Sequence, residues 1–144
     1  MRRLVSILLA FVATAALAGA PAGDATLPAK EWKAIRGVIT EQLAALKAGD
    51  GAKAMTYAVP DLRAEFGTPE RFLRMVRQSY SALLDARSTT FLTGAIVDGA
   101  TIQPLQLVLP DNSVEVALYQ MRKQKDGRWR IAGCVLAPST VQAI

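Results

Sequence analysis

The sequence contains no histidine and only one cysteine, Cys134, among its 144 residues. Histidine is the commonest metal ligand and the commonest general base in proteins, so its absence argues against a zinc site and against the usual acid–base chemistry. A single cysteine cannot form an intramolecular disulfide, so the stability of the fold must come from its core. We therefore expect no metal site and no cofactor.

The chain begins with a short positively charged stretch. Arg2 and Arg3 precede an uncharged apolar run, Leu4–Ala18, which ends in small residues. This order is typical of a secretory signal peptide, and Ala16-Leu17-Ala18 predicts cleavage before Gly19. The alternative is an uncleaved membrane anchor, but a spanning helix needs about 20 apolar residues and this run is shorter. We expect a periplasmic or secreted protein without a stable membrane span after cleavage.

Removal of residues 1–18 leaves 126 residues, with 15 basic and 12 acidic side chains and a formal charge of +3. A chain of this length forms one domain. The small charge excess lacks the clustering that nucleic-acid binding requires, so we expect no nucleic-acid partner. Residues 19–28 are rich in Ala, Gly and Pro and are predicted to be a flexible lead-in, followed by a single domain over residues 29–140.

Helical periodicity marks the first half of this domain. Apolar residues recur every three or four positions up to Gly49, and Asp50 can cap a second, short helix. Residues 61–66 favour one further helical turn. Thr68-Pro69 then starts a longer helix, with a hydroxyl at the N-cap and proline at the first helical position. The apolar stripes of the two longer helices are Trp32, Ile35, Ile39, Leu43 and Leu46, and Phe72, Met75, Val76, Tyr80, Leu83 and Leu84.

From residue 89 onward the pattern changes to β-branched and apolar runs, at residues 89–97, 101–109, 114–123 and 128–136. Two of the three joints are Asp-Gly, the preferred two-residue hairpin turn, so the runs predict an antiparallel meander. Helices followed by such a meander predict an α+β fold. We expect the N-terminal helices to pack on one face of a curved four-stranded antiparallel sheet.

Turn lengths fix the register of the strands and therefore the face that each side chain occupies. With two-residue turns at both Asp-Gly pairs and a four-residue loop at 110–113, a row of Gly94, Gln103, Gln120 and Gly133 crosses the helix-covered face. The glycines leave space and the amides supply polar groups, which favours a cavity floor. The alternative is that the row lies at the open end of the sheet and meets solvent. The candidate pocket residues are Tyr57, Tyr80, Gln103, Gln120, Arg122 and Trp129.

The same register leaves the opposite face of the sheet uncovered. An uncovered apolar face often marks an interface, so we expect a homodimer or a protein partner there. Scattered exposed apolar residues are the alternative interpretation. Cys134 would lie on this face as a small apolar residue rather than a nucleophile, since the chain has no histidine to activate it. The candidate interface residues are Phe91, Val108, Tyr119, Met121 and Cys134.

Several motifs resemble a family of exported bacterial domains of unknown function. They are Gly49-Asp50, Phe66-Gly67-Thr68-Pro69-Glu70 and the stretch from Asp126-Gly127-Arg128-Trp129 to Cys134. The resemblance covers nearly all of residues 30–137, and this family is placed with the nuclear-transport-factor-like, ketosteroid-isomerase-like cone folds. It implies a curved sheet wrapped around helices, often with a pocket at the wide end and dimerisation through the sheet. It brings no catalytic residues, because fold alone does not carry function.

Two functions fit these features. The first is a non-catalytic exported module that binds a small apolar ligand or a protein partner. The second is a cofactor-free isomerase, dehydratase or hydrolase, in which Tyr57, Tyr80, Gln103 and Gln120 polarise a substrate. Asp61 and Glu65 lie near the predicted pocket mouth, either as an acid or base acting with Tyr80 or as ordinary solvated carboxylates.

The predicted cleavage can be tested on the full chain expressed in a bacterial host. We expect the mature protein in the periplasmic fraction, with Gly19 as its first residue, because cleavage follows the small residues that end the apolar run. N-terminal sequencing or intact mass measures this directly. A chain that retains Met1 and stays in the membrane fraction would contradict the prediction.

Overall fold

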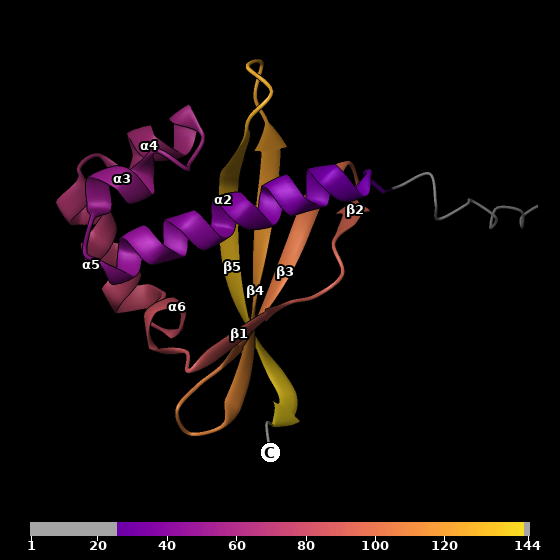
Figure 1. Ribbon diagram of the computed structural model, residues 1–144. Coiled ribbons are helices and arrows are strands. Elements are labelled where there is room, and N and C mark those ends of the chain that lie inside the picture. Colours follow the sequence, from indigo (N-terminus) through magenta and orange to yellow (C-terminus); the bar gives the residue numbers. More distant parts are fainter. Residues whose placement is uncertain (1–25, 143–144) are drawn as a thin grey trace, which may run out of the picture.

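The computed structural model describes residues 26–142, with side chains described up to residue 139. The predicted signal peptide and most of the predicted lead-in lie outside the described residues. In the described part, the helices come first and the strands follow, and α2 crosses one face of the sheet (Figure 1). The elements are α2 (Ala29–Lys47), α3 (Gly51–Met55), α4 (Pro60–Phe66), α5 (Pro69–Ser79), α6 (Ala82–Asp85), β1 (Ser88–Phe91), β2 (Ala95–Val97), β3 (Ala100–Val108), β4 (Ser113–Lys123) and β5 (Trp129–Gln142).

The helices form where the periodicity and the caps predict them. α2 buries the predicted stripe, with Ile35 and Ile39 at its centre. The Asp50 side chain accepts a hydrogen bond from the backbone N–H of Lys53 and caps α3, while the Thr68 hydroxyl caps α5 in the same way. The predicted continuous stripe through residue 84 is interrupted, however. Tyr80 leaves helical geometry, and the chain turns there from α5 into α6.

The sheet has five antiparallel strands rather than the predicted four, because the run at 89–97 is divided into β1 and β2. The Leu92 N–H donates to the carbonyl of Pro104, but proline has no N–H to return the bond. Instead, the side-chain amide of Gln103 donates to the Leu92 carbonyl at 2.8 Å. The ladder therefore stops after β1, and β2 resumes pairing further along β3. The predicted α+β class is confirmed.

The loop between β3 and β4 is one residue shorter than predicted. Residues 110–112 form the loop, and the Leu109 N–H donates to the carbonyl of Ser113 at 2.9 Å. Asn112 closes the turn in the left-handed region, with φ of 70°. Asparagine tolerates this conformation better than most residues, and a turn followed by one left-handed residue is a common three-residue hairpin loop.

This one-residue difference reverses the predicted faces of β4. Val114 pairs with Val108, whereas a four-residue loop would pair it with Leu109. Since side chains alternate between the two faces of a strand, the shift turns every β4 side chain over. Tyr119 and Met121 face the helices, which corrects their predicted position on the uncovered face.

The hairpin between β4 and β5 contains two compensating irregularities. Its loop is also three residues long, 125–127, with Gly127 in the left-handed region instead of a two-residue Asp-Gly turn. A β-bulge at Ala132 then restores the register, so that Tyr119 pairs with Cys134 as predicted. Because β4 is turned over, Cys134 faces the helices together with Tyr119. The break between β1 and β2 also places Phe91 on the face opposite to the predicted one. Phe91 pairs with Leu105, faces the helices and packs against the core.

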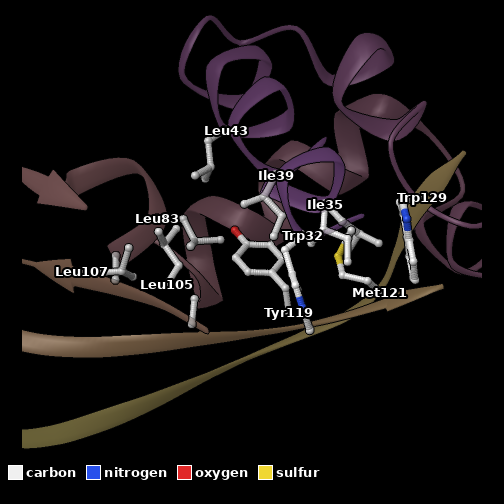
Figure 2. Close-up of a cluster of buried hydrophobic side chains, with 13 residues drawn as sticks. Trp32, Ile35, Ile39, Leu43, Leu83, Leu105, Leu107, Tyr119, Met121 and Trp129 are labelled. Atoms are coloured by element: carbon white, nitrogen blue, oxygen red, sulfur yellow. The ribbon is translucent and has the colours of Figure 1, made fainter. Parts of the chain in front are cut away.

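The resulting core lies between the sheet and the helices. Figure 2 shows Tyr119 and Met121 of β4 directed toward α2, beside Trp32, Ile35 and Ile39. The opposite face has no helix over it in the described part of the chain (Figure 1). It exposes Val97, Leu118 and Val135 at 53%, 37% and 61% of their surfaces.

The space that the sequence predicts above Gly94 is filled by the indole ring of Trp32. A Cβ atom added at Gly94 would overlap this ring. The four residues of the predicted cavity floor are also divided between the two faces, since Gln103 pairs with Tyr119 and not with Gln120. The predicted row across one face of the sheet is therefore wrong.

The close contact between Gly94 and Trp32 predicts that a larger residue at position 94 destabilises the fold. We expect Gly94→Ala to lower the free energy of unfolding by roughly 1–3 kcal/mol, because the methyl group displaces a packed tryptophan. Gly37, on the exposed side of α2, has no atom within 4 Å of an added Cβ. We expect Gly37→Ala, the matched control, to raise stability by roughly 0.5–1 kcal/mol through helix propensity. Urea unfolding followed by circular dichroism measures both, and equal effects would contradict the packing account.

Candidate functional site

A cavity of about 260 Å³ lies between the helices and the β5 edge of the sheet, and it opens to solvent. α2, α4, α5 and α6 form its walls, together with the residue that joins α5 to α6. β4 and β5 form its floor. The lining residues are Gln42, Leu46, Leu62, Glu65, Phe66, Phe72, Met75, Val76, Tyr80, Leu83, Tyr119, Ile131, Gly133 and Cys134.

Most of this lining is apolar. Phe66 of α4 and Phe72 of α5 stack with ring centroids 4.2 Å apart and planes 15° apart, which joins the two helices at the wall. Val76, Leu83 and Ile131 are buried beside the cavity. A concave apolar surface with a few polar groups is the usual form of a small-molecule site.

Tyr119 is the unusual polar group of the cavity floor. Its side chain is 1% exposed, and its hydroxyl has no hydrogen-bond partner among the described residues. Figure 2 shows this hydroxyl pointing away from the strand, toward the helices between Ile39 and Leu83. A buried hydroxyl without a partner is unfavourable, so a group of this kind in a folded protein calls for an explanation.

Cys134 lies opposite Tyr119 on the neighbouring strand. Burial raises the pKa of Tyr119 well above its usual value, and the adjacent thiol adds to this effect. The thiol and the hydroxyl are close enough to interact, although their alignment falls short of a well-formed hydrogen bond. Burial also raises the pKa of the Cys134 thiol to about 12, despite the opposing effect of the Tyr119 hydroxyl. Both groups are therefore neutral near pH 7.

The other polar groups of the cavity have partners or contact solvent. The Tyr80 hydroxyl donates to the backbone carbonyl of Cys134 at 3.2 Å, and the side-chain amide of Gln42 donates to the carbonyl of Ala54 at 3.2 Å. Glu65 is exposed on α4 and is the one carboxylate in the described lining. No lysine or arginine is among these lining residues.

Of the six predicted pocket residues, the cavity contains only Tyr80. Gln103 is fully buried, and its side-chain amide donates to the Leu92 carbonyl at the break between β1 and β2. Gln120 and Arg122 are exposed, because the shifted register turns Gln120 to the face opposite Tyr119 and Arg122 to the face opposite Met121. Tyr57 packs half-buried at the edge of the core.

Trp129, the remaining candidate, ties the β4–β5 hairpin to α2. Its indole N–H donates to a carboxylate oxygen of Glu31 at 2.6 Å, and the Lys123 ammonium contacts the second oxygen at 3.2 Å. These two bonds lower the pKa of Glu31, with the bond from Trp129 as the larger cause. We therefore interpret Trp129 as a structural residue.

The structure also places most of the predicted interface residues on the face opposite to the predicted one. Phe91, Tyr119, Met121 and Cys134 lie on the helix-covered face, and Tyr119 and Cys134 line the cavity. Val108 does lie on the opposite face but is buried there, paired with Val114. The aromatic wall of Phe66 and Phe72 was missed as a site, although Phe66 begins one of the motifs that resemble the family and Phe72 belongs to a predicted apolar stripe.

A second, more open hollow of about 520 Å³ lies on the uncovered face of the sheet. Its lining is uncharged and mostly apolar, and it includes the exposed Val97, Leu118 and Val135. Within residues 26–142, no helix is both long and apolar enough to cross a membrane. In the same residues, no group of three or more acidic or cysteine side chains is placed to hold a metal ion.

Comparison with known protein families gives a match over most of the chain. Residues 28–144 match the model of a family described as a domain of unknown function, DUF4864. No curated protein and no solved structure matches the chain. The match confirms the domain-of-unknown-function part of the resemblance in the sequence, while the cone fold and export stay predictions.

Removing the Tyr119 hydroxyl tests whether it is without a hydrogen-bond partner in the folded protein. We expect Tyr119→Phe to raise the free energy of unfolding by about 1 kcal/mol, because the change removes a buried donor that has no partner. The matched change Tyr80→Phe removes a hydroxyl that has one, and we expect it to lower stability by about 1 kcal/mol. Urea unfolding of both variants measures the difference. Destabilisation by Tyr119→Phe would show that its hydroxyl is hydrogen-bonded in the folded protein.

Proposed function

We propose that this chain, which belongs to the DUF4864 family of domains of unknown function, is an exported module that binds a small apolar molecule without transforming it. The observation that carries the proposal is the cavity of about 260 Å³, whose walls are mostly apolar and include the stacked rings of Phe66 and Phe72. Export rests on the signal peptide that the sequence predicts.

The size of the cavity fits a compact ligand. An apolar cavity of about 150 Å³ in another protein holds a benzene ring. The cavity between α2, α5 and the sheet is larger, at about 260 Å³, and it opens to solvent. It therefore accommodates one ring with a short substituent.

The polar groups around the cavity favour binding over catalysis. Tyr80 and Gln42 are engaged with backbone carbonyls. A thiol with a pKa of about 12 is a poor nucleophile near pH 7, because almost none of it is thiolate. Glu65 is exposed to solvent rather than buried, so the described lining lacks the desolvated carboxylate that acid–base chemistry would use.

The proposal is tested with ethylbenzene, a hydrocarbon that fits a cavity of this volume. We expect saturable binding in NMR titrations of the mature protein, with the largest shifts at Val76, Leu83 and Ile131. Met75→Trp, which adds bulk from a half-buried lining position, should abolish these shifts. Arg74→Trp is the control, since this exposed neighbour on α5 does not line the cavity.

Two results would count against cavity binding. One is the absence of saturable shifts in the wild-type protein. The other is an equal loss of binding in both tryptophan variants, because only one of them fills the cavity. Thermal unfolding in the presence of ethylbenzene supplies an independent readout, since a ligand that binds only the folded state raises the midpoint.

The uncovered sheet face supports a second candidate, which is self-association. Its central hollow is lined by uncharged residues, so two copies related by a two-fold axis would meet there without charge repulsion. The exposed Val97, Leu118 and Val135 would be buried by such contact. We infer that a second copy of the chain covers this face.

Sedimentation analysis of the mature protein tests self-association. We expect a dimer at micromolar concentration, and Val135→Lys should make it monomeric because the change places a charge in the contact. Thr40→Lys adds the same charge at an exposed position of α2 and should leave the dimer intact. A wild-type monomer at all concentrations tested would contradict the inference.

A further inference from the structure

We propose that the tip of the β4–β5 hairpin docks the domain on a bilayer that contains anionic phospholipid. This basic hairpin tip consists of residues 122–130, which carry five basic side chains and one acidic side chain. The five basic residues line neither the cavity nor the hollow on the uncovered sheet face. The inference therefore goes beyond ligand binding and does not depend on it.

The basic hairpin tip holds the whole excess of positive charge in the described part of the chain. Residues 26–142 contain 15 basic and 11 acidic side chains. Outside the tip there are ten of each, so the rest of the described domain has no net charge. The excess is small for the chain as a whole, but it is gathered within nine residues and gives a strong local field.

The hairpin presents this charge to solvent. It extends past α2 at one end of the sheet (Figure 1). Arg130 is half-buried, and the other four basic side chains are exposed. A partner with a flat, negatively charged surface can therefore approach the tip without first meeting the helices. The exposed residues are Arg122, Lys123, Lys125 and Arg128.

Carboxylates of the protein neutralise only part of the tip. Lys123 pairs with Glu31 at 3.2 Å, and Arg128 lies 4.0 Å from Asp126. The second pair joins two largely exposed groups at the limit of an ion pair, so it contributes little. The other three basic residues of the tip have no carboxylate partner among the described residues.

Two of these residues face each other across the hairpin. Arg122 of β4 pairs directly with Arg130 of β5, and cross-strand partners lie on the same face of a sheet. Like charges in this position destabilise strand pairing. The Arg130 guanidinium uses one N–H on the backbone carbonyl of Trp129, which leaves the charge itself uncompensated. An anionic group that contacts both side chains would turn this repulsion into a favourable interaction.

The adjacent strand pair fixes the tip to the helices. Glu31 of α2 accepts a hydrogen bond from the Trp129 indole of β5 and contacts the Lys123 ammonium of β4. One carboxylate therefore holds both strands of the hairpin. Because the tip is held in place before it meets a partner, docking costs little conformational entropy.

The side chains of the tip favour a lipid surface over a nucleic acid or an acidic protein. Proteins that bind single-stranded nucleic acids add exposed aromatic rings to their charge, but Trp129, the aromatic residue of this segment, is buried. Protein interfaces have an apolar centre, and the exposed residues of the tip are polar or charged. An anionic bilayer requires only charge at its surface.

Cosedimentation of the mature protein with lipid vesicles tests the proposal. We expect binding to vesicles of equimolar phosphatidylcholine and phosphatidylglycerol, weakening as salt is added, and no binding to phosphatidylcholine alone. Each basic side chain near an anionic bilayer strengthens binding about fivefold. The combined change Arg122→Gln, Lys125→Gln and Arg128→Gln should therefore weaken binding roughly 100-fold.

The matched control removes the same charge from α5, which lies away from the tip (Figure 1). Arg71→Gln, Arg74→Gln and Arg77→Gln change three exposed arginines together, and we expect vesicle binding to stay within about twofold of the wild type. Circular dichroism confirms that both triple variants are folded. The tip variant should also bind ethylbenzene as the wild type does, because none of its changes lies in the cavity.

Three results would overturn docking through the tip. The first is equal loss of vesicle binding in both triple variants, which would show an effect of net charge alone. The second is equal binding of the wild-type protein to vesicles with and without phosphatidylglycerol. The third is displacement from the anionic vesicles by a DNA oligonucleotide at lower concentration than by free phosphatidylglycerol vesicles, which would assign the tip to nucleic acid.

Discussion

The left-handed backbone of Asn112 sets which face of β4 meets the helices. With φ of 70° at this residue, the loop between β3 and β4 contains three residues, and Val114 pairs with Val108. Side chains alternate along a strand, so this single pairing decides that Tyr119 is buried beneath the helices and Leu118 is exposed on the other side. The cavity floor and the uncovered apolar face both follow from it.

Local features of the sequence predicted the architecture, whereas register depended on details that residue types alone do not determine. Periodicity and caps located α2 and α5, because these depend on neighbouring residues. The face of β4 was predicted wrongly, since the choice between a three- and a four-residue loop rests on one φ angle. The division between β1 and β2 could be suspected from Pro104, but it also requires the Gln103 amide to replace the missing donor.

Strand register also decided which residues of the candidate site could be predicted from the sequence. Tyr80 was predicted as a pocket residue because it continues a helical stripe, and the structure places it there. Tyr119 and Cys134 were predicted for the opposite face because the loop was counted one residue too long. Their true position gives the cavity its polar floor, while the helices contribute the apolar wall of Phe66 and Phe72. The functional proposal therefore depends on the corrected register rather than on composition.

Tyr119 points into the space between the sheet and the helices. Nuclear Overhauser contacts in the mature protein, with selectively labelled methyl groups, measure this most directly. We expect contacts from the Tyr119 ring to the methyl groups of Ile39 and Leu83, beside which it lies in Figure 2. Contacts from Leu118 to those same methyl groups, with none from Tyr119, would show the opposite register and contradict the account.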